Sequence, residues 1–270
     1  MTSPGTPRLG RPGLDVQPRR IAVAGATGLV GAQVVALAGR EGHHVVGLSR
    51  GLGVDLTDPR SLGNSLLGVD AVIDVTRSPS MEEQQAVGFF TTVATHLGAA
   101  AWAAGVRRTV VLSIVGADRS QDYGWYVATQ AHEETTRAHA PGPRVLRATQ
   151  LHEFPGQVLD RSLRGGRAEV LDMPTQPVDS AEVARLLVKL ATEEGGGDVE
   201  VAGPRPEHLG DLVRRLAGLR GEEVDVVSAS TPSSIAGGSL LPGPEALRRG
   251  VDWDTWASRQ SYDVGPEVDS

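Results

Sequence analysis

Short apolar runs alternate with longer amphipathic stretches along most of the chain, and this alternation predicts a parallel sheet covered by helices. The runs are rich in valine, isoleucine and leucine, which is typical of strands buried on both faces. They lie at residues 20–25, 45–49, 70–75, 109–113 and 144–148. Between them the apolar positions recur with a helical period, which indicates crossover helices. The expected architecture is a doubly wound α/β domain.

The crossover helices have recognisable start and stop signals. They are expected at residues 29–40, 59–67, 81–104 and 122–140. Asp58 precedes Pro59 and is placed to cap the second helix. Gly42 and Gly105 stand where the first and third helices are expected to end.

Beyond residue 150 the alternation weakens, and we expect a smaller lobe. One clear amphipathic helix covers 179–194, with Val183 and Leu187 on its apolar face and Glu182 and Lys189 on its polar face. Weaker patterns predict strands at 199–202 and 224–227 and a helix at 209–217. The predicted fold is a Rossmann-type doubly wound parallel sheet with a small C-terminal α/β lobe.

A glycine-rich turn links the first predicted strand to the first predicted helix. Gly25 permits a tight turn, Gly28 lets a diphosphate approach the backbone, and Gly31 lets the helix pack closely on the sheet. The free amides and the helix dipole at this point favour an anion. The strand–turn–helix context therefore predicts a dinucleotide site. Its expected residues are Gly25, Thr27, Gly28, Leu29, Val30 and Gly31.

The end of the second strand indicates which dinucleotide is bound. NAD sites usually place an acid there, about 20 residues after the glycines, whereas this chain has Ser49 and Arg50. A hydroxyl and a guanidinium suit a 2′-phosphate. NADP(H) is therefore the preferred cofactor, with NAD(H) as the alternative. Further cofactor contacts are expected after other strands, from Asp55, Leu56, Thr76 and Gln150.

Composition excludes several classes of site. The 270 residues include no cysteine, which removes disulfide scaffolds, iron–sulfur clusters and thiolate zinc sites. The His132-Glu133 and His152-Glu153 pairs lack a second histidine four residues on, so no metal site is predicted. The net charge of −7 argues against a nucleic-acid partner. The expected partner is a small-molecule substrate.

The chain is expected to divide into four segments. These are a disordered lead-in at 1–19, an NAD(P)-binding Rossmann domain at 20–150, a substrate-side lobe packed on that domain at 151–262, and a loose tail at 263–270. The lead-in has no apolar core typical of a signal peptide, so a cytoplasmic location is expected.

One uncharged stretch, residues 86–106, is long enough to raise the question of a membrane span. Its threonines, histidine and glycines favour a buried helix instead, and no membrane partner is expected. The same helix would suit packing against a second copy of the chain, which leaves a homodimer open.

Several longer motifs together resemble one known superfamily. They are IAVAGATGLVGAQVV, LSRGLGVDLTDP, DAVIDV, RRTVVLSIVGAD, PRVLRATQLHEF and QPVDSAEVARLLVKLA. They resemble the atypical short-chain dehydrogenase/reductase superfamily, above all its NmrA-like and nucleotide-sugar-epimerase-related NAD(P)-binding proteins. The resemblance runs from about Arg20 to Arg259. It implies an NAD(P)H-dependent reductase, an epimerase-like enzyme, or a redox sensor that binds the cofactor without turnover.

Extended members of that superfamily transfer protons with a Tyr-x-x-x-Lys pair, and this chain lacks it. In one register Trp125 and Thr129 occupy the two positions, and in the neighbouring register Tyr126 and Gln130 occupy them. The chain's one lysine, Lys189, lies on a different predicted helix. Cofactor binding and dehydrogenase chemistry are therefore separate expectations.

Three residues remain as catalytic candidates. Ser113 stands where the resemblance places a catalytic serine or threonine, Tyr126 offers a phenol, and His152 is the best remaining proton donor. A strand-end cap for Ser113 and a packing role for His152 are equally consistent with the sequence. The expected function is an NADP(H)-dependent oxidoreductase on a small quinone, carbonyl or enone. A redox sensor and a cofactor-retaining isomerase or dehydratase are the alternatives.

Overall fold

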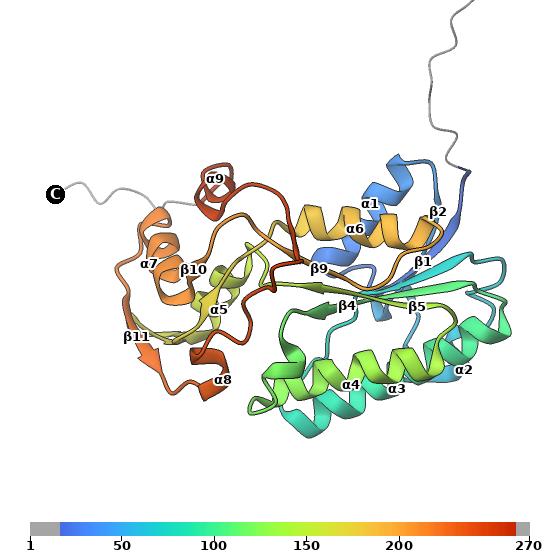
Figure 1. Cartoon of the computed structure of the whole chain (residues 1–270), viewed down its shortest axis with the longest axis horizontal. Helices are drawn as coiled ribbons and strands as arrows, with labels where there is room; N and C mark the ends of the chain where they lie inside the picture. The colour runs from blue at the N-terminus through green and yellow to red at the C-terminus, as the bar shows by residue number, and fades with distance from the viewer. Residues whose placement is uncertain (1–16, 263–270) are drawn as a thin grey trace, which may run out of the picture.

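A seven-stranded parallel sheet forms the centre of the protein, which a computed structural model describes over residues 17–262 (Figure 1). Its strand order is β12-β9-β5-β4-β3-β1-β2. The bounds are β1 (Arg20–Ala24), β2 (His44–Leu48), β3 (Ala71–Asp74), β4 (Arg108–Ile114), β5 (Pro143–Ala148), β9 (Val199–Ala202) and β12 (Leu247–Arg248). Every pairing in this sheet is parallel, so the predicted doubly wound architecture is confirmed.

Helices cover both faces of the sheet, α1 and α6 one face, α3 and α4 the other (Figure 1). Their bounds are α1 (Leu29–Arg40), α2 (Pro59–Leu62), α3 (Glu83–Ala103), α4 (Gly124–His139) and α6 (Ser180–Thr192). Successive residues of a strand point to opposite faces. Ile21 and Val23 therefore pack in the core beneath α1 and α6, and Ala22 and Ala24 pack in the core towards α3.

A smaller lobe stands at the carboxyl ends of the central strands (Figure 1). Its three-stranded sheet has the order β11-β7-β6. The bounds of its elements are α5 (Phe154–Ser162), β6 (Leu163–Arg164), β7 (Arg167–Leu171), β8 (Pro174–Thr175), β10 (Glu207–His208), α7 (Leu209–Leu219), β11 (Asp225–Ala229), α8 (Ser233–Ala236) and α9 (Trp253–Ala257). Its core includes the buried side chains of Leu159, Met173, Leu212 and Trp253.

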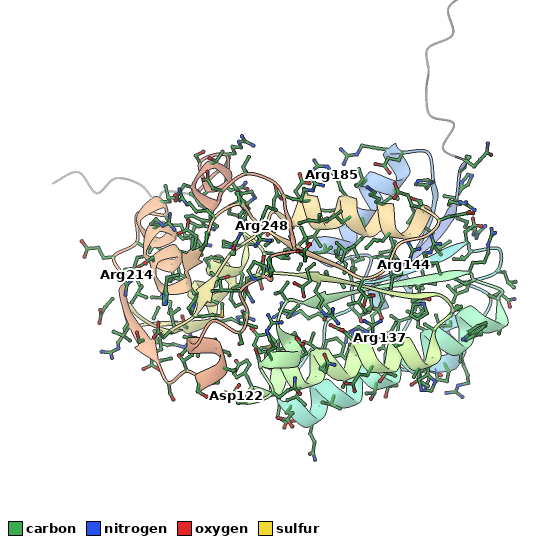
Figure 2. All side chains as sticks on the ribbon, viewed as in Figure 1. Asp122, Arg137, Arg144, Arg185, Arg214 and Arg248 are labelled. Carbon is green, nitrogen blue, oxygen red and sulfur yellow. The ribbon has the colours of Figure 1, made fainter. Side chains whose placement is uncertain are left out.

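Polar contacts join the lobe to the large sheet's helices. Asp122 lies just before α4, at the end of the helix pair that faces the lobe (Figure 2). It accepts hydrogen bonds from Ser233 Oγ at 3.3 Å and from Ser234 N at 3.1 Å. Ser120 and Ser239 share a hydroxyl hydrogen bond of 2.6 Å nearby. These contacts hold α8 against the start of α4, on the side away from α9.

The element boundaries differ from the predicted ones mainly where glycine ends an element early. The helix expected over 59–67 ends at Leu62, because Gly63 has a positive φ of 43°. Asp58 caps it as predicted, accepting from Arg60 N. Within the segment expected as the lobe, α6 and β9 lie with the central sheet, so the division at residue 150 stays a prediction. The expectations for 1–16 and 263–270 lie outside the described residues.

By length and composition, α3 is apolar enough to cross a membrane. In this fold it packs lengthwise on α4, with 39 % of its apolar window buried (Figure 1). Near the C-terminal end of α3, Gly98 permits close packing against the end of α4, because a Cβ there would lie 2.6 Å from the carbonyl oxygen of His139.

Candidate functional site

The glycine turn has the geometry that a bound diphosphate requires. Gly25 has a φ of 84°, and a Cβ there would lie 2.8 Å from the carbonyl oxygen of Val75. A Cβ on Gly31 would lie 2.1 Å from the carbonyl oxygen of Gly25, so only glycine allows α1 to begin this close to β1. Thr27 and Gly28 are exposed at the tip of the turn. The turn thus forms an open backbone cradle.

The first turn of α1 leaves its amides without partners in the helix. Gly28 occupies the N-cap position and offers no side chain to cap it. The first backbone bond of the helix runs from Ala32 N to Gly28 O, so the amides of Leu29, Val30 and Gly31 have no carbonyl to bond within it. Free amides at the positive end of a helix dipole bind anions. These residues therefore fit the diphosphate of a dinucleotide.

The end of β2 offers a hydroxyl and a guanidinium. Ser49 Oγ is buried and has no hydrogen-bond partner among the described residues. Arg50 follows on the surface, at the start of the short 3-10 turn Arg50–Leu52. An unpartnered hydroxyl beside an exposed guanidinium fits a phosphate, which would supply the missing acceptor.

The remaining predicted cofactor residues occupy different environments. Asp55 binds the amide and hydroxyl of Thr57, and these hydrogen bonds lower the Asp55 pKa. Leu56 is buried. Thr76 follows β3 at the carboxyl edge, and its Oγ1 is buried with no hydrogen-bond partner within residues 17–262. Gln150 follows β5 at the same edge, where its Oε1 accepts from Thr175 Oγ1 at 2.7 Å. Thr76 and Gln150 thus flank the line along which a dinucleotide would lie.

Ser113 belongs to a buried polar cluster between β4, β5 and α4. Its hydroxyl donates to Glu133 Oε1 at 2.5 Å. Arg147 from β5 donates to the same carboxylate through Nε, at 2.9 Å, and through Nη2. The Glu133 side chain is 1 % exposed. The proton of Ser113 is therefore already engaged in a structural hydrogen bond.

Neither register of the tyrosine–lysine pair provides a proton relay. Thr129 is buried, and its hydroxyl donates to the carbonyl oxygen of Trp125, one turn earlier in its own helix. Gln130 donates to Glu134. Tyr126 packs in the core of the lobe, and burial raises the pKa of its phenol further above the ordinary value. Because the Tyr126 phenol stays protonated at neutral pH, it is a poor general base there.

His152 is 1 % exposed and held from two sides. Its Nε2 lies 3.1 Å from the carbonyl oxygen of Val251, and its own carbonyl oxygen accepts from Trp253 Nε1 at 3.0 Å. Burial lowers the pKa of the imidazole, so the ring is neutral at neutral pH. This environment matches the packing role, although the ring also lines a cleft beside α1. Catalysis by His152 stays a prediction.

The sequence did not predict a second buried polar contact, between Asp74 and His132. Asp74 at the end of β3 lies 3.0 Å from His132 Nε2 on α4, and both side chains are at most 3 % exposed. Burial alone would raise the Asp74 pKa, but the charge and hydrogen bond of His132 outweigh burial and hold it below its ordinary value. Phe90 stacks on the His132 ring at 4.6 Å. The pair fixes α4 against the sheet beside Thr76.

The cleft beside α1 has a volume of about 830 Å³. It lies between the first turns of α1 and α6 on one side and α5, α7 and α9 on the other. Leu29 lines it, and Leu29 is also the first helical residue after the glycine turn. The cleft therefore opens directly beside the predicted dinucleotide site.

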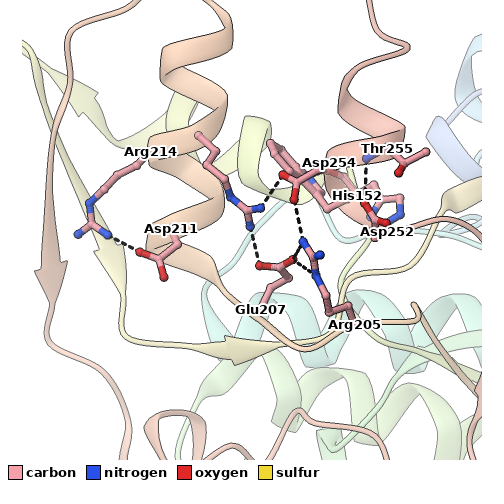
Figure 3. Close-up of polar contacts among 10 residues, drawn as sticks. His152, Arg205, Glu207, Asp211, Arg214, Asp252, Asp254 and Thr255 are labelled. Atoms are coloured by element: carbon pink, nitrogen blue, oxygen red, sulfur yellow. Dashed lines mark hydrogen bonds and ion pairs between the residues drawn. The ribbon is translucent and has the colours of Figure 1, made fainter.

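An ion-pair network holds α9 at the edge of this cleft (Figure 3). Arg215 on α7 binds Asp254 and Glu207, each at 2.5 Å, and Arg205 binds the same two carboxylates at 2.7 and 3.0 Å. The guanidinium of Arg215 also lies over the Trp253 ring at 5.2 Å. Because two arginines share two carboxylates, the network fixes the position of α9 more firmly than isolated surface pairs would.

Comparisons with known proteins agree with this geometry. The sequence profile of the NAD dependent epimerase/dehydratase family matches residues 21–144, which contain the glycine turn and β1 to β4. The chain is 32 % identical, over 240 residues, to a (4-alkanoyl-5-oxo-2,5-dihydrofuran-3-yl)methyl phosphate reductase of Streptomyces griseus; the match covers 78 % of this chain and 79 % of that protein.

Solved structures share the fold at low sequence identity. A dTDP-4-dehydrorhamnose reductase of Clostridium acetobutylicum superposes with a TM-score of 0.71 at 15 % identity, covering 88 % of this chain and 97 % of that one. A dTDP-4-dehydrorhamnose reductase of Bacillus anthracis, in complex with NADP, gives a TM-score of 0.67 at 12 % identity, covering 90 % and 98 %. At such identities the likeness concerns the fold.

Proposed function

The chain belongs to the NAD dependent epimerase/dehydratase family, within the atypical short-chain dehydrogenases/reductases, and from this premise we propose that it is an NADP(H)-dependent reductase of a small conjugated acceptor. One observation carries the proposal. The protein keeps a complete diphosphate cradle at Gly25–Gly31 but has Trp125 and Thr129, or Tyr126 and Gln130, at the positions of the proton-relay pair.

The missing relay favours a conjugated acceptor over a simple ketone. Reduction of a ketone produces an alkoxide, a strong base that needs a positioned proton donor. Addition of hydride to the β-carbon of an enone produces a delocalised enolate. Its oxygen is much less basic than an alkoxide oxygen, and its α-carbon can afterwards take a proton from water. Holding the two reactants close and aligned then supplies much of the rate. The name of the Streptomyces griseus relative, which specifies a 5-oxo-2,5-dihydrofuran with an alkanoyl group, supports this class of acceptor.

The residues of this chain have distinct roles in the proposal. The amides of Leu29, Val30 and Gly31 hold the diphosphate, and Ser49 with Arg50 binds the 2′-phosphate. Gln150 and Thr76, at the carboxyl edge of the sheet, orient the nicotinamide half of the cofactor. When bound, the reduced nicotinamide supplies the hydride. Glu133 positions β4 and β5 through Ser113 and Arg147, and it does not touch the reactants.

Matched acceptors test the proposal. We expect purified protein to oxidise NADPH with 2-cyclohexenone or 1,4-benzoquinone and to leave cyclohexanone, the saturated ketone of the same ring size, unreduced. The absorbance of the reduced nicotinamide follows the reaction. Equal rates with cyclohexanone and 2-cyclohexenone would contradict the argument from the missing relay.

Cofactor preference is tested at Arg50. Arg50→Glu replaces an attraction to the 2′-phosphate with a repulsion, so we expect NADPH binding to weaken roughly a hundredfold, corresponding to about 3 kcal/mol. NADH binding should change less than threefold. Arg40→Glu, the same charge change on the exposed end of α1, is the matched control and should leave both unchanged. An equal loss for the two cofactors would remove Arg50 from the 2′-phosphate site.

A redox sensor is the second candidate, favoured by the same replacement of the relay pair. Such a protein would bind NADP(H) and alter a partner without turnover. Tight NADPH binding with no oxidation across a broad panel of quinones, enones and aldehydes would favour it over the reductase.

The proposal also covers location and assembly. We propose a cytoplasmic location, because α3, the described helix that is apolar enough to cross a membrane, packs against α4 within the fold. The outer side of α3, where the Trp102 side chain is 64 % exposed, suits a second copy of the chain. Light scattering should therefore give twice the monomer mass of 28.3 kDa, and Trp102→Glu should lower it. A monomer at micromolar concentration contradicts the dimer.

A further inference from the structure

The cleft beside α1 carries an excess of negative charge. Four acidic side chains line it, Glu153, Asp160, Asp179 and Glu222. Arg220 is the one arginine or lysine among the described residues of its lining, and its guanidinium already pairs with Asp160 at 2.6 Å and lies 3.8 Å from Glu222. An anionic group entering this cleft would meet repulsion, whereas a cation would meet attraction.

A hydrogen-bond chain across the cleft wall leaves acceptors unused. Gln33 Nε2 donates to Ser180 Oγ at 2.7 Å, and Ser180 donates its one hydroxyl proton to Glu153 Oε1 at 2.5 Å. This order of donors leaves Gln33 Oε1 and Glu153 Oε2 unused, and both are buried with no hydrogen-bond partner in the part of the chain that the structure describes. Burial raises the pKa of Glu153, as expected of a carboxyl group without a counter-ion.

His152 adds a third unused acceptor to the same cleft. Its Nε2 faces the carbonyl oxygen of Val251 at 3.1 Å, and a carbonyl only accepts, so Nε2 carries the proton. Nδ1 of the neutral ring is then an acceptor, and it too is buried without a partner. Buried polar atoms in native proteins almost always have partners. Three unused acceptors in one cleft therefore indicate a ligand that brings donors.

Aromatic side chains complete the wall. Trp256 and Tyr262 line the cleft, and the Trp256 ring lies 5.3 Å from the His152 ring. The faces of tryptophan and tyrosine attract cations. Negative charge, unused acceptors and aromatic faces together match the three donors and single positive charge of an ammonium group.

We propose that this cleft binds a protonated amine of the substrate, so that the acceptor reduced at the neighbouring nicotinamide site carries an amino group. The inference rests on the proposed reductase function, because Leu29 places the cleft beside the dinucleotide turn. It also separates this chain from its Streptomyces griseus relative, whose name specifies a phosphate ester. Among the described residues that line the cleft, a phosphate would find no free cation.

Three probes with one carbon skeleton test the proposal. Phenethylamine, phenethyl alcohol and phenethyl phosphate are titrated into the full chain saturated with NADPH, and tryptophan fluorescence reports binding through Trp256. We expect phenethylamine to bind at least tenfold more tightly than the alcohol, and the phosphate to bind most weakly. Equal binding of amine and alcohol, tighter binding of the phosphate, or no binding by the amine would each overturn the proposal.

Variants of the cleft carboxylates locate the binding. Glu153→Gln keeps a carbonyl oxygen for Ser180 and removes the charge, so phenethylamine should bind about tenfold more weakly while phenethyl alcohol changes less than twofold. Glu169→Gln, on the exposed side of β7 and outside the cleft, is the matched control. Unchanged amine affinity in a folded Glu153→Gln protein contradicts the assignment.

A second variant keeps the test valid if Glu153→Gln does not fold. Asp160 is exposed on α5, so Asp160→Asn should leave the fold intact. It removes one carboxylate and frees Arg220, and we expect weaker phenethylamine binding together with tighter phenethyl phosphate binding. No change in either affinity contradicts the proposal.

Different measurements would contradict the reductase function and the amine-binding cleft. Absence of NADPH binding, or of 2-cyclohexenone reduction by the wild-type protein, counts against the reductase. Normal binding and reduction with no preference for phenethylamine counts against the amine site alone.

Discussion

Replacing Gly28 with alanine separates the binding role of the glycine turn from its folding role. Gly28 lies at the exposed tip with φ −77° and ψ 174°, a conformation open to alanine. Its added Cβ would lie 3.3 Å from the carbonyl oxygen of Gly25, which a small shift relieves. Alanine restricts the unfolded chain by about 0.4–1 kcal/mol but is a poorer N-cap by a similar amount. We expect the free energy of unfolding to change by less than about 0.5 kcal/mol.

The same methyl group stands where the diphosphate must approach. It would push the phosphates away from the amides of Leu29 and Val30, which have no other partner within the helix. Hydrogen bonds to charged groups contribute about 1.5–3 kcal/mol each, so losing two costs about 3 kcal/mol or more. That energy corresponds to a weakening of NADPH binding by more than a hundredfold.

Calorimetric titration of NADPH into Gly28→Ala measures this loss, and thermal melting checks the fold. Gly39→Ala is the matched control, because Gly39 lies on the same helix and an added Cβ would meet nothing within 4 Å. The control should bind NADPH normally and gain about 0.5–1 kcal/mol of stability. A folded Gly28→Ala protein that binds NADPH within threefold of the wild type would refute the proposed cradle.

Three further predictions concern the framework around the site. Gly31→Ala puts a Cβ 2.1 Å from a backbone oxygen and should destabilise the fold by about 3 kcal/mol, lowering the melting temperature by roughly 6–12 °C; an unchanged melt would contradict the packing argument. Glu133→Ala leaves Arg147 without its buried partner and should cost about 3 kcal/mol in chemical denaturation, with a smaller loss for Glu133→Gln. The pKa of Asp74 is lower in the folded than in the unfolded protein, so its contribution to stability is full above about pH 4 and is lost as the pH falls through the folded value. Asp74→Asn should remove this contribution, so the free energy of unfolding of the variant should fall less steeply than that of the wild type as the pH is lowered. The same dependence on pH in both proteins would contradict the pairing with His132.

Local signals made the dinucleotide half of the protein predictable. The glycine turn, the buried strands and the capping Asp58 each specify structure within a few residues, and the structure has them where the sequence places them. The lobe gave weaker signals. Its strand β6 has two residues, and α5 has nine and contains a proline and a glycine, so neither shows a readable period.

The sequence did not predict which residues, far apart along the chain, form buried pairs. Asp74 and His132 lie 58 positions apart, and Ser113 and Glu133 lie 20 apart. In the sequence His132-Glu133 resembles the start of a metal motif, whereas in the structure the two side chains hold β3 and β4 against α4 through Asp74 and Ser113. One signal was available, because a carboxylate at the end of the apolar strand 70–75 needs a buried partner. No residue near Asp74 in the sequence identifies His132 as that partner.

Binding of a nicotinamide nucleotide by the wild-type protein is the claim on which the account depends. Calorimetric titration with NADPH, NADP⁺, NADH and NAD⁺ tests it directly. We predict saturable heat with one bound nucleotide per chain and tightest binding for an NADP form. A folded protein that gives no heat of binding with any of the four, at protein concentrations of tens of micromolar, would contradict the reductase and the sensor alike.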